Sequence, residues 1–167
     1  MELIATVNGK MVFHLDLHSS PLVMEELPPF TWVALVISGE AGDRYCADIL
    51  AVCKSKKTGY IVCSGRESAR DYEYFDMETF DIGEPSQDRF EKPPCVIQKE
   101  SPAEALWYSL YFATCEDGEL RSVVCLDATE RGVKSYLKAQ AEEMNGDESY
   151  LAPEAGEETI EYDSLGH

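Results

Sequence analysis

Cys125 and Arg131 have the spacing of a cysteine phosphatase loop. The apolar start of VVCLDATERG (123–132) ends at Cys125, and five residues separate this cysteine from Arg131. Such a loop needs a cysteine thiolate, backbone amides that face the phosphate and an arginine that clamps it. Asp127 and Glu130 would instead repel a phosphate dianion, and the loop has no glycine before Arg131. We interpret the stretch as a strand, an Asp and a helix cap, and keep Cys125, Asp127 and Arg131 as the catalytic set of an alternative function.

Other catalytic patterns have less support. His14 and His18 are four residues apart, which on a strand separates them by roughly 13 Å, too far to chelate one metal ion. The sequence contains no C-x-x-C pair, no G-x-S-x-G elbow and no glycine-rich phosphate loop. It therefore predicts neither a metal nor a cofactor, and it favours a protein that is not an enzyme.

Turn and cap signals divide the chain into alternating strands and helices. Asn8-Gly9 predicts a tight turn that joins two strands into a hairpin over residues 2–18. Buried strands are predicted in FTWVALVISG, YIVCSG and LRSVVCLDA, and helices in RYCADILAVCKS, in AEALWYSLYFATC and after Thr129. Ser101 and Glu104 form a capping box, and Thr129 is the expected N-cap of the last helix. This order predicts an α/β fold with a mostly parallel sheet flanked by helices, as in Rossmann-like or flavodoxin-like three-layer proteins.

The composition predicts one domain and a tail. The domain is expected over residues 1–144, with strands and helices alternating over 30–144, because a chain of this size can bury a core of its own. The segment 145–167 has seven acidic residues, no Lys or Arg and few apolar residues. It is therefore predicted to be an acidic disordered tail.

A ligand pocket is expected beyond the carboxyl ends of the predicted strands, where open α/β sheets bind their ligands. Those ends carry polar side chains that follow three different strands. The predicted pocket residues are Ser38, Ser64, Arg66, Asp127 and Thr129.

The charge of the chain restricts its partners. With 32 acidic residues against 14 Lys and Arg, the formal net charge is -18, which argues against direct nucleic-acid binding and favours a basic protein partner. The longest apolar run, WVALVI, is far too short to span a membrane. The six cysteines mostly lie in apolar segments without a redox or zinc spacing, so we expect reduced thiols and a cytoplasmic protein.

Two segments have the composition of contact surfaces. The segment 69–94 interleaves acids with aromatic residues, so it is either an irregular crossover pinned to the core or a partner surface. The partner-binding residues would be Tyr72, Tyr74, Phe75, Asp76 and Asp81. The aromatic residues of AEALWYSLYFATC nearly encircle their helix, which is either covered by the crossover or makes a homodimer. That homodimer would use Trp107, Tyr108, Tyr111 and Phe112.

These segments also resemble a known family. FTWVALVISG, TGYIVCSG, METFDIGEPSQDRF, ESPAEALWYSLYFATC and LRSVVCLDATERG occur in the order found in an uncharacterised family of small bacterial α/β proteins, over about Phe30 to Glu143. The resemblance implies an α/β fold and a cytosolic bacterial setting, and it brings no established activity.

The sequence thus favours a non-enzymatic acidic protein that captures a basic protein partner, as an immunity protein or antitoxin neutralises a cationic toxin. The alternative is a small-ligand binder or phosphoester-processing enzyme that uses the strand-end pocket near Cys125 and Arg131.

Overall fold

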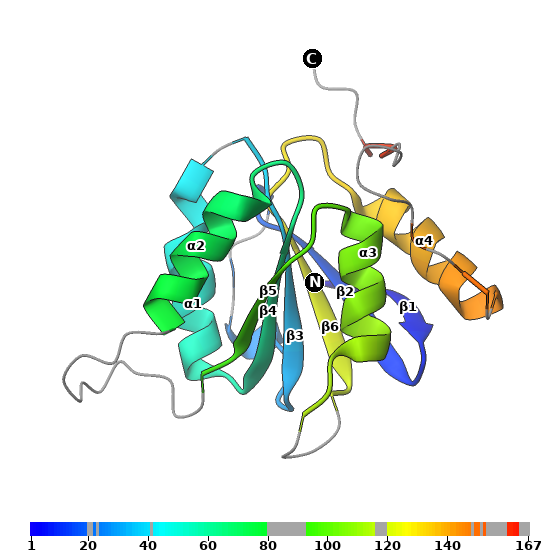
Figure 1. Cartoon of the computed structure of the whole chain (residues 1–167), viewed down its shortest axis with the longest axis horizontal. Helices are drawn as coiled ribbons and strands as arrows, with labels where there is room; N and C mark the ends of the chain where they lie inside the picture. The colour runs from blue at the N-terminus through cyan, green and yellow to red at the C-terminus, as the bar shows by residue number, and fades with distance from the viewer. Residues whose placement is uncertain are drawn as a thin grey trace.

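The protein is built around a six-stranded sheet in the order β1-β2-β6-β3-β4-β5 (Figure 1). A computed structural model describes residues 1–19, 22, 24–40, 42–79, 93–115, 120–147, 149–150, 152 and 160–163. The β1 strand pairs antiparallel with β2, and every further neighbouring pair in this order is parallel. The strands are β1 (Glu2–Val7), β2 (Lys10–Asp16), β3 (Trp32–Ile37), β4 (Thr58–Ser64), β5 (Cys95–Gln98) and β6 (Ser122–Asp127). The predicted α/β fold is confirmed.

The N-terminal hairpin forms as its turn residues predict. Asn8 and Gly9 have positive φ angles of 51° and 72°, the conformation that a tight type I′ turn requires at both central positions. The turn joins β1 to β2, and β2 then pairs with β6 from the far end of the sequence.

Helices cover the two faces of the sheet in pairs (Figure 1). On one face, α1 and α2 enclose a core with Ile49, Phe75 and Leu126; on the other, α3 and α4 enclose a core with Leu35, Leu106 and Leu137. Because both faces are covered, β3 and β6 are buried along their whole length, as central parallel strands are. The helices are α1 (Cys46–Ser55), α2 (Ser68–Thr79), α3 (Pro102–Trp107) and α4 (Lys134–Gly146), with the short η1 (Met24–Glu26), η2 (Gly42–Tyr45) and the π-helical η3 (Tyr108–Phe112).

The two predicted helix caps have opposite outcomes. The Ser101 side chain accepts a hydrogen bond from the Glu104 amide at 3.2 Å at the start of α3, as its capping box predicts. Thr129, however, does not cap α4, which begins only at Lys134. The hydroxyl of Thr129 instead donates to Asp127, so it belongs to the loop between β6 and α4.

The described first part of the segment 69–94 is helical rather than irregular. Its first part lies in α2, and residues 80–92, with Asp81 among them, lie outside the described residues. Phe75 is 0% exposed and packs in the core under α2, while Tyr72 and Tyr74 are half-buried against the same core. Phe75 therefore cannot be an exposed contact for a partner, because its position on α2 faces the sheet.

The structure describes part of the segment 145–167 that the sequence predicts to be a disordered tail. The α4 helix continues to Gly146, past the expected boundary at 144, and Ile160 packs against the core cluster that α3 and α4 cover. Figure 1 shows the described residues 160–163 beside the N-terminal end of α4. None of the helices in the described part of the chain has the length and apolar character that a membrane span requires.

We predict that Phe75 stabilises the fold. Phe75→Ala should lower the free energy of unfolding by about 3–5 kcal/mol, because it empties a fully buried position. Urea denaturation measures the change. Met77→Ala on the same helix is the control: Met77 is 74% exposed, so its loss should change stability by no more than about 0.5 kcal/mol. A Phe75→Ala protein of unchanged stability would contradict the described packing.

Candidate functional site

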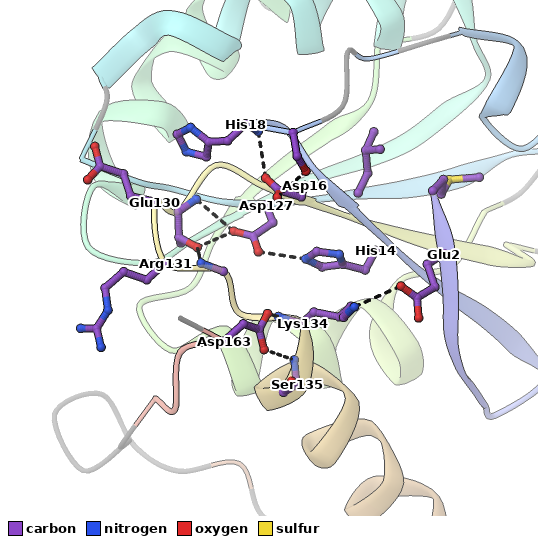
Figure 2. A pocket seen from close by; sticks show the side chains of 15 residues that line it. Glu2, His14, Asp16, His18, Asp127, Glu130, Arg131, Lys134, Ser135 and Asp163 are labelled. Carbon is purple, nitrogen blue, oxygen red and sulfur yellow. Dashed lines mark hydrogen bonds and ion pairs between the residues drawn. The ribbon is translucent and has the colours of Figure 1, made fainter. Parts of the chain in front are cut away.

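A cavity of about 550 Å³ lies at the carboxyl edge of the sheet, where β2, β6 and α4 meet (Figure 2). The end of β2 and the following loop contribute His14, Asp16 and His18. The last residue of β6 contributes Asp127, the loop between β6 and α4 contributes Thr129 and Arg131, and the start of α4 contributes Lys134 and Ser135. Asp163 reaches the same cavity from the C-terminal segment.

The topology of the sheet explains this place. After β6 the chain enters α4 on one face, whereas after the neighbouring β3 it enters α1 on the other face. Loops that leave neighbouring parallel strands for opposite faces create the crevice at which open α/β sheets bind ligands. The two loops also touch: a Cβ added to Gly39 would lie 1.9 Å from the Ala128 carbonyl oxygen, so the contact requires glycine there.

Asp127 is the most deeply buried polar group of the cavity. It is 0% exposed, and its Oδ1 accepts the Thr129 amide at 2.9 Å and the Thr129 hydroxyl. Its Oδ2 accepts the Val133 amide at 2.9 Å and lies 2.9 Å from Nε2 of His14. These contacts satisfy both oxygens, which a buried carboxylate requires, and they also fix the path of the loop toward α4.

The imidazole of His14 is oriented by Asp127. Because the carboxylate accepts the hydrogen bond, Nε2 of His14 carries the proton and acts as the donor. The other ring nitrogen, Nδ1, is then left for further hydrogen bonding. Nδ1 has no hydrogen-bond partner among the residues that the structure describes, although the side chain is only 7% exposed and lines the cavity. The pair can therefore offer Nδ1 to a ligand, as an acceptor when the ring is neutral or as a donor when it is protonated.

His18 is held at both of its ring nitrogens. Its Nε2 lies 3.0 Å from the Ala128 carbonyl oxygen and its Nδ1 lies 3.1 Å from the Tyr45 hydroxyl. Asp16 fixes the same turn by accepting the His18 amide at 2.9 Å and the Ser19 hydroxyl at 2.6 Å. Within the described ranges, no group of three or more His, Cys, Asp or Glu side chains is arranged to hold a metal ion.

The first turn of α4 binds a carboxylate from elsewhere in the chain. Asp163 accepts the Lys134 amide at 2.8 Å and the Ser135 amide at 2.9 Å (Figure 2). Burial by itself would raise the pKa of Asp163, but the hydrogen bonds from Ser135 and Lys134 and the charge of His14 outweigh it and lower the pKa. The amides at a helix N-terminus and the helix dipole favour an anion in this position.

The structure brings together only part of the predicted pocket. Asp127 and Thr129 line the cavity, whereas Ser38, Ser64 and Arg66 do not. The Ser38 hydroxyl donates to the Ser64 carbonyl oxygen at 3.0 Å and accepts the Glu67 amide at 2.9 Å, so it ties the end of β3 to the start of α2. Ser64 is fully buried, and Arg66 points to solvent, where it pairs with Glu40 at 3.2 Å. These residues lie at the ends of β3 and β4, and both strands are followed by helices on the opposite face of the sheet from α4.

Cys125 does not meet the requirements of a nucleophile. Its side chain is fully buried in the core cluster under α3 and α4. Burial, and then the charge of Asp127, raise the pKa of the Cys125 thiol far above its ordinary value, whereas a catalytic cysteine needs a lowered one. The guanidinium of Arg131 lies 4.5 Å from the centre of the Tyr162 ring. The predicted catalytic set is therefore not assembled around a phosphate.

The aromatic residues proposed for a homodimer form one cluster at the end of α3. The ring centres of Trp107 and Phe112 lie 5.3 Å apart, and Tyr108 stacks on Phe112 with 5.8 Å between the ring centres. Phe112 is 60% exposed and Tyr111 is 40% exposed, whereas Trp107 and Tyr108 are half-buried. The outer edge of the cluster faces solvent.

Sequence reasoning missed His14, Lys134, Ser135 and Asp163 as cavity residues. The signal for His14 was the alternation in VFHLDL, which places His14 and Asp16 on one side of an otherwise apolar strand. No local signal pointed to Asp163, because its contacts lie 28 and 29 residues earlier in the chain.

The sheet, its two helical layers and this cavity define a three-layer α/β protein with a site at the carboxyl edge of the sheet. The chain belongs to the family described as a domain of unknown function (DUF7684), which matches residues 11–144. The match confirms the resemblance to an uncharacterised family, and it spans His14 and Asp127 but neither β1 nor Asp163. The comparison with curated proteins gives no match.

We predict that Cys125 is unreactive in the folded protein. Iodoacetamide at pH 8 should modify the exposed Cys95 and leave Cys125 unmodified, because burial blocks access and raises the thiol pKa. Cys53 serves as the control, since burial raises its pKa to about 12 and it should be equally protected. Peptide mass mapping reads the result, and unfolding in urea should expose all six thiols. Fast modification of Cys125 in the native state would contradict its described burial.

Proposed function

We propose that the protein binds a small polar ligand non-covalently in the cavity at the carboxyl edge of the sheet. The observation that carries this proposal is the His14–Asp127 pair, which holds an almost buried imidazole in one orientation with Nδ1 unpaired among the described residues. Nδ1 of His14 is not among the buried polar atoms that lack a partner in the described residues, so it stays accessible to a ligand that enters the cavity. The cavity of about 550 Å³ falls in the size range of small-molecule sites.

The surroundings of His14 support binding rather than covalent catalysis. The Cys125 thiol lies in the core beneath the cavity, and the hydroxyl of Thr129 is used by Asp127. A ligand would meet the Nδ1 atom of His14 together with the charged side chains of Asp16 and Arg131. A molecule with both hydrogen-bond donors and acceptors fits this mixture. Six free thiols agree with a reducing, cytoplasmic setting for such a protein.

The test is a ligand screen with the full-length protein by thermal shift, followed by calorimetry on His14→Gln. The glutamine amide can still donate to Asp127 but lacks the Nδ1 position, so affinity for a genuine ligand should fall about tenfold, the equivalent of one hydrogen bond. His18→Gln is the matched control: both ring nitrogens of His18 already have partners within the protein, so the change should alter affinity less than about threefold. A ligand that binds His14→Gln as tightly as the unaltered protein would contradict the proposal.

Capture of a basic protein is the second candidate, as in an immunity or antitoxin-like inhibitor. The net charge of -18 favours a cationic partner, and the outward side of α2 presents Glu73, Met77 and Glu78 to solvent. On this helix Met77 takes the apolar role that the sequence assigned to Phe75, and Asp76 is half-buried beside it. A second copy of the chain is a poorer partner for the aromatic cluster at Phe112, because two such charges repel.

For this candidate we expect a basic protein to be retained from native lysate at low salt and lost at high salt. Glu73→Lys with Glu78→Lys should abolish retention, because the double change reverses the charge around Met77. Reversal of Glu142 and Glu143 on α4 is the control of equal charge on the other face of the sheet. Retention that responds equally to both pairs would reflect net charge alone and would contradict a surface on α2.

A further inference from the structure

Nε1 of Trp32 and Oγ of Ser122 are buried polar atoms without a hydrogen-bond partner among the residues that the structure describes. Trp32 is the first residue of β3, and Ser122 is the first residue of β6. Their exposed fractions are 0% and 1%, so bulk solvent does not satisfy either group. Because buried polar groups in proteins are normally hydrogen-bonded, two neighbouring ones without a partner point to a bound molecule.

Trp32 and Ser122 lie beside each other in one layer of the core. The strands β3 and β6 are parallel neighbours (Figure 1), and their register pairs Trp32 with Ser122. The indole packs in the core that α1 and α2 enclose, and Val124 and Leu126, two and four residues after Ser122, pack in the same core. The indole N–H and the serine hydroxyl therefore share one face of two strands roughly 4.8 Å apart, without bonding to each other.

Thr58 flanks Trp32 on the β4 side, but its hydroxyl is not equivalent to that of Ser122. Its Oγ1 also lacks a partner with full hydrogen-bond geometry, and it lies in register with Trp32. Burial raises the pKa of the Cys53 thiol to about 12, and the Thr58 side chain lowers it by a smaller amount through a hydrogen bond. The Thr58 hydroxyl therefore has a sulfur neighbour, which leaves Ser122 as the hydroxyl for Trp32.

The two atoms lie only one residue inside the surface. Arg121, directly before Ser122, is exposed, and its guanidinium lies 5.1 Å from the centre of the exposed Phe30 ring. Thr31, directly before Trp32, is half-buried. A small molecule can therefore reach this amino edge of the sheet through a local opening, without unfolding of the domain.

The chemistry of the two groups restricts the bound molecule. An indole N–H only donates, whereas a serine hydroxyl both donates and accepts, so the bound molecule must accept at least one hydrogen bond. The surrounding core is apolar, which disfavours an ion because a buried charge requires a partner of opposite charge. A neutral molecule that both accepts and donates fits these conditions, and water is the smallest one.

We infer that the amino edge of the sheet contains an internal binding site for one water molecule, between Nε1 of Trp32 and Oγ of Ser122. The water accepts a hydrogen bond from the indole and forms a second one with the hydroxyl, as buried waters do for polar groups without a protein partner. It links β3 to β6 at their first residues. The site lies at the opposite edge of the sheet from the proposed ligand cavity and does not depend on it.

The experiment uses the full-length protein, labelled with ¹⁵N, and observes contacts between water and the indole protons. The chain has two tryptophans, and Trp107, half-buried on the other face of the sheet, is the internal control. In rotating-frame spectra, a dipolar contact with a bound water and chemical exchange with solvent have opposite signs. We expect a dipolar contact at Trp32 that is stronger than any at Trp107. Absence of this contact, or an equal contact at both indoles, would overturn the inference.

Removal of the serine hydroxyl gives a second test. Ser122→Ala should abolish the water contact at Trp32 and raise the equilibrium constant of unfolding about fivefold, the equivalent of one hydrogen bond, as measured by urea denaturation. Thr58→Val, on the other side of Trp32, is the matched control and should keep the water contact. An unchanged or increased stability of Ser122→Ala would mean that its hydroxyl binds nothing, and loss of the contact in Thr58→Val alone would contradict the assignment to Ser122.

Discussion

A carboxylate that is taken completely out of water must be compensated by hydrogen bonds, and Asp127 meets this constraint with contacts that organise the whole site. Its partners come from the β6–α4 loop, from the residue that precedes α4 and from β2. Loss of the Asp127 carboxylate would leave buried donors such as the Val133 amide without an acceptor, which costs on the order of 1–3 kcal/mol for each group. The carboxylate therefore links the start of α4 to the central sheet and fixes the ring of His14 in one step.

This arrangement depends on where the chain places β6. The last strand enters the sheet between β2 and β3, so that Cys125 is opposite His14 and Asp127 is opposite Asp16. Residues more than a hundred positions apart become neighbours through that insertion. It also separates the loops after β6 and β3 onto opposite faces and thereby opens the crevice. The same topology that completes the core thus creates the cavity.

The features predicted from sequence are those that a few neighbouring residues determine. Asn8-Gly9 sets the hairpin turn by its own φ preferences, and Ser101 finds its partner Glu104 within one helical turn. Thr129 satisfies the same local rule, but its hydroxyl donates to Asp127 two residues earlier, so the loop continues and α4 begins only at Lys134. For Phe75 the acids around it in sequence left both a core position and a partner contact open, and the helical period of α2 turns it inward. The contact of Asp163 with the first amides of α4 was not predictable either, because Asp163 lies in a segment with no local sequence pattern.

The charge of the molecule constrains what the cavity can bind. In a chain with a net charge of -18, a free anion is repelled at long range, and short-range hydrogen bonds, a helix dipole and the cationic side chains of Arg131 and Lys134 would have to overcome that repulsion. The first turn of α4 provides the hydrogen bonds and the dipole, and it is the place where the acidic tail puts one of its own carboxylates. Asp16 in the same cavity would repel a purely anionic ligand but would attract a positive or hydrogen-bond-donating group. A ligand of the kind proposed above would therefore place its hydrogen-bond donors toward Asp16, because Asp163 already holds the first amides of α4.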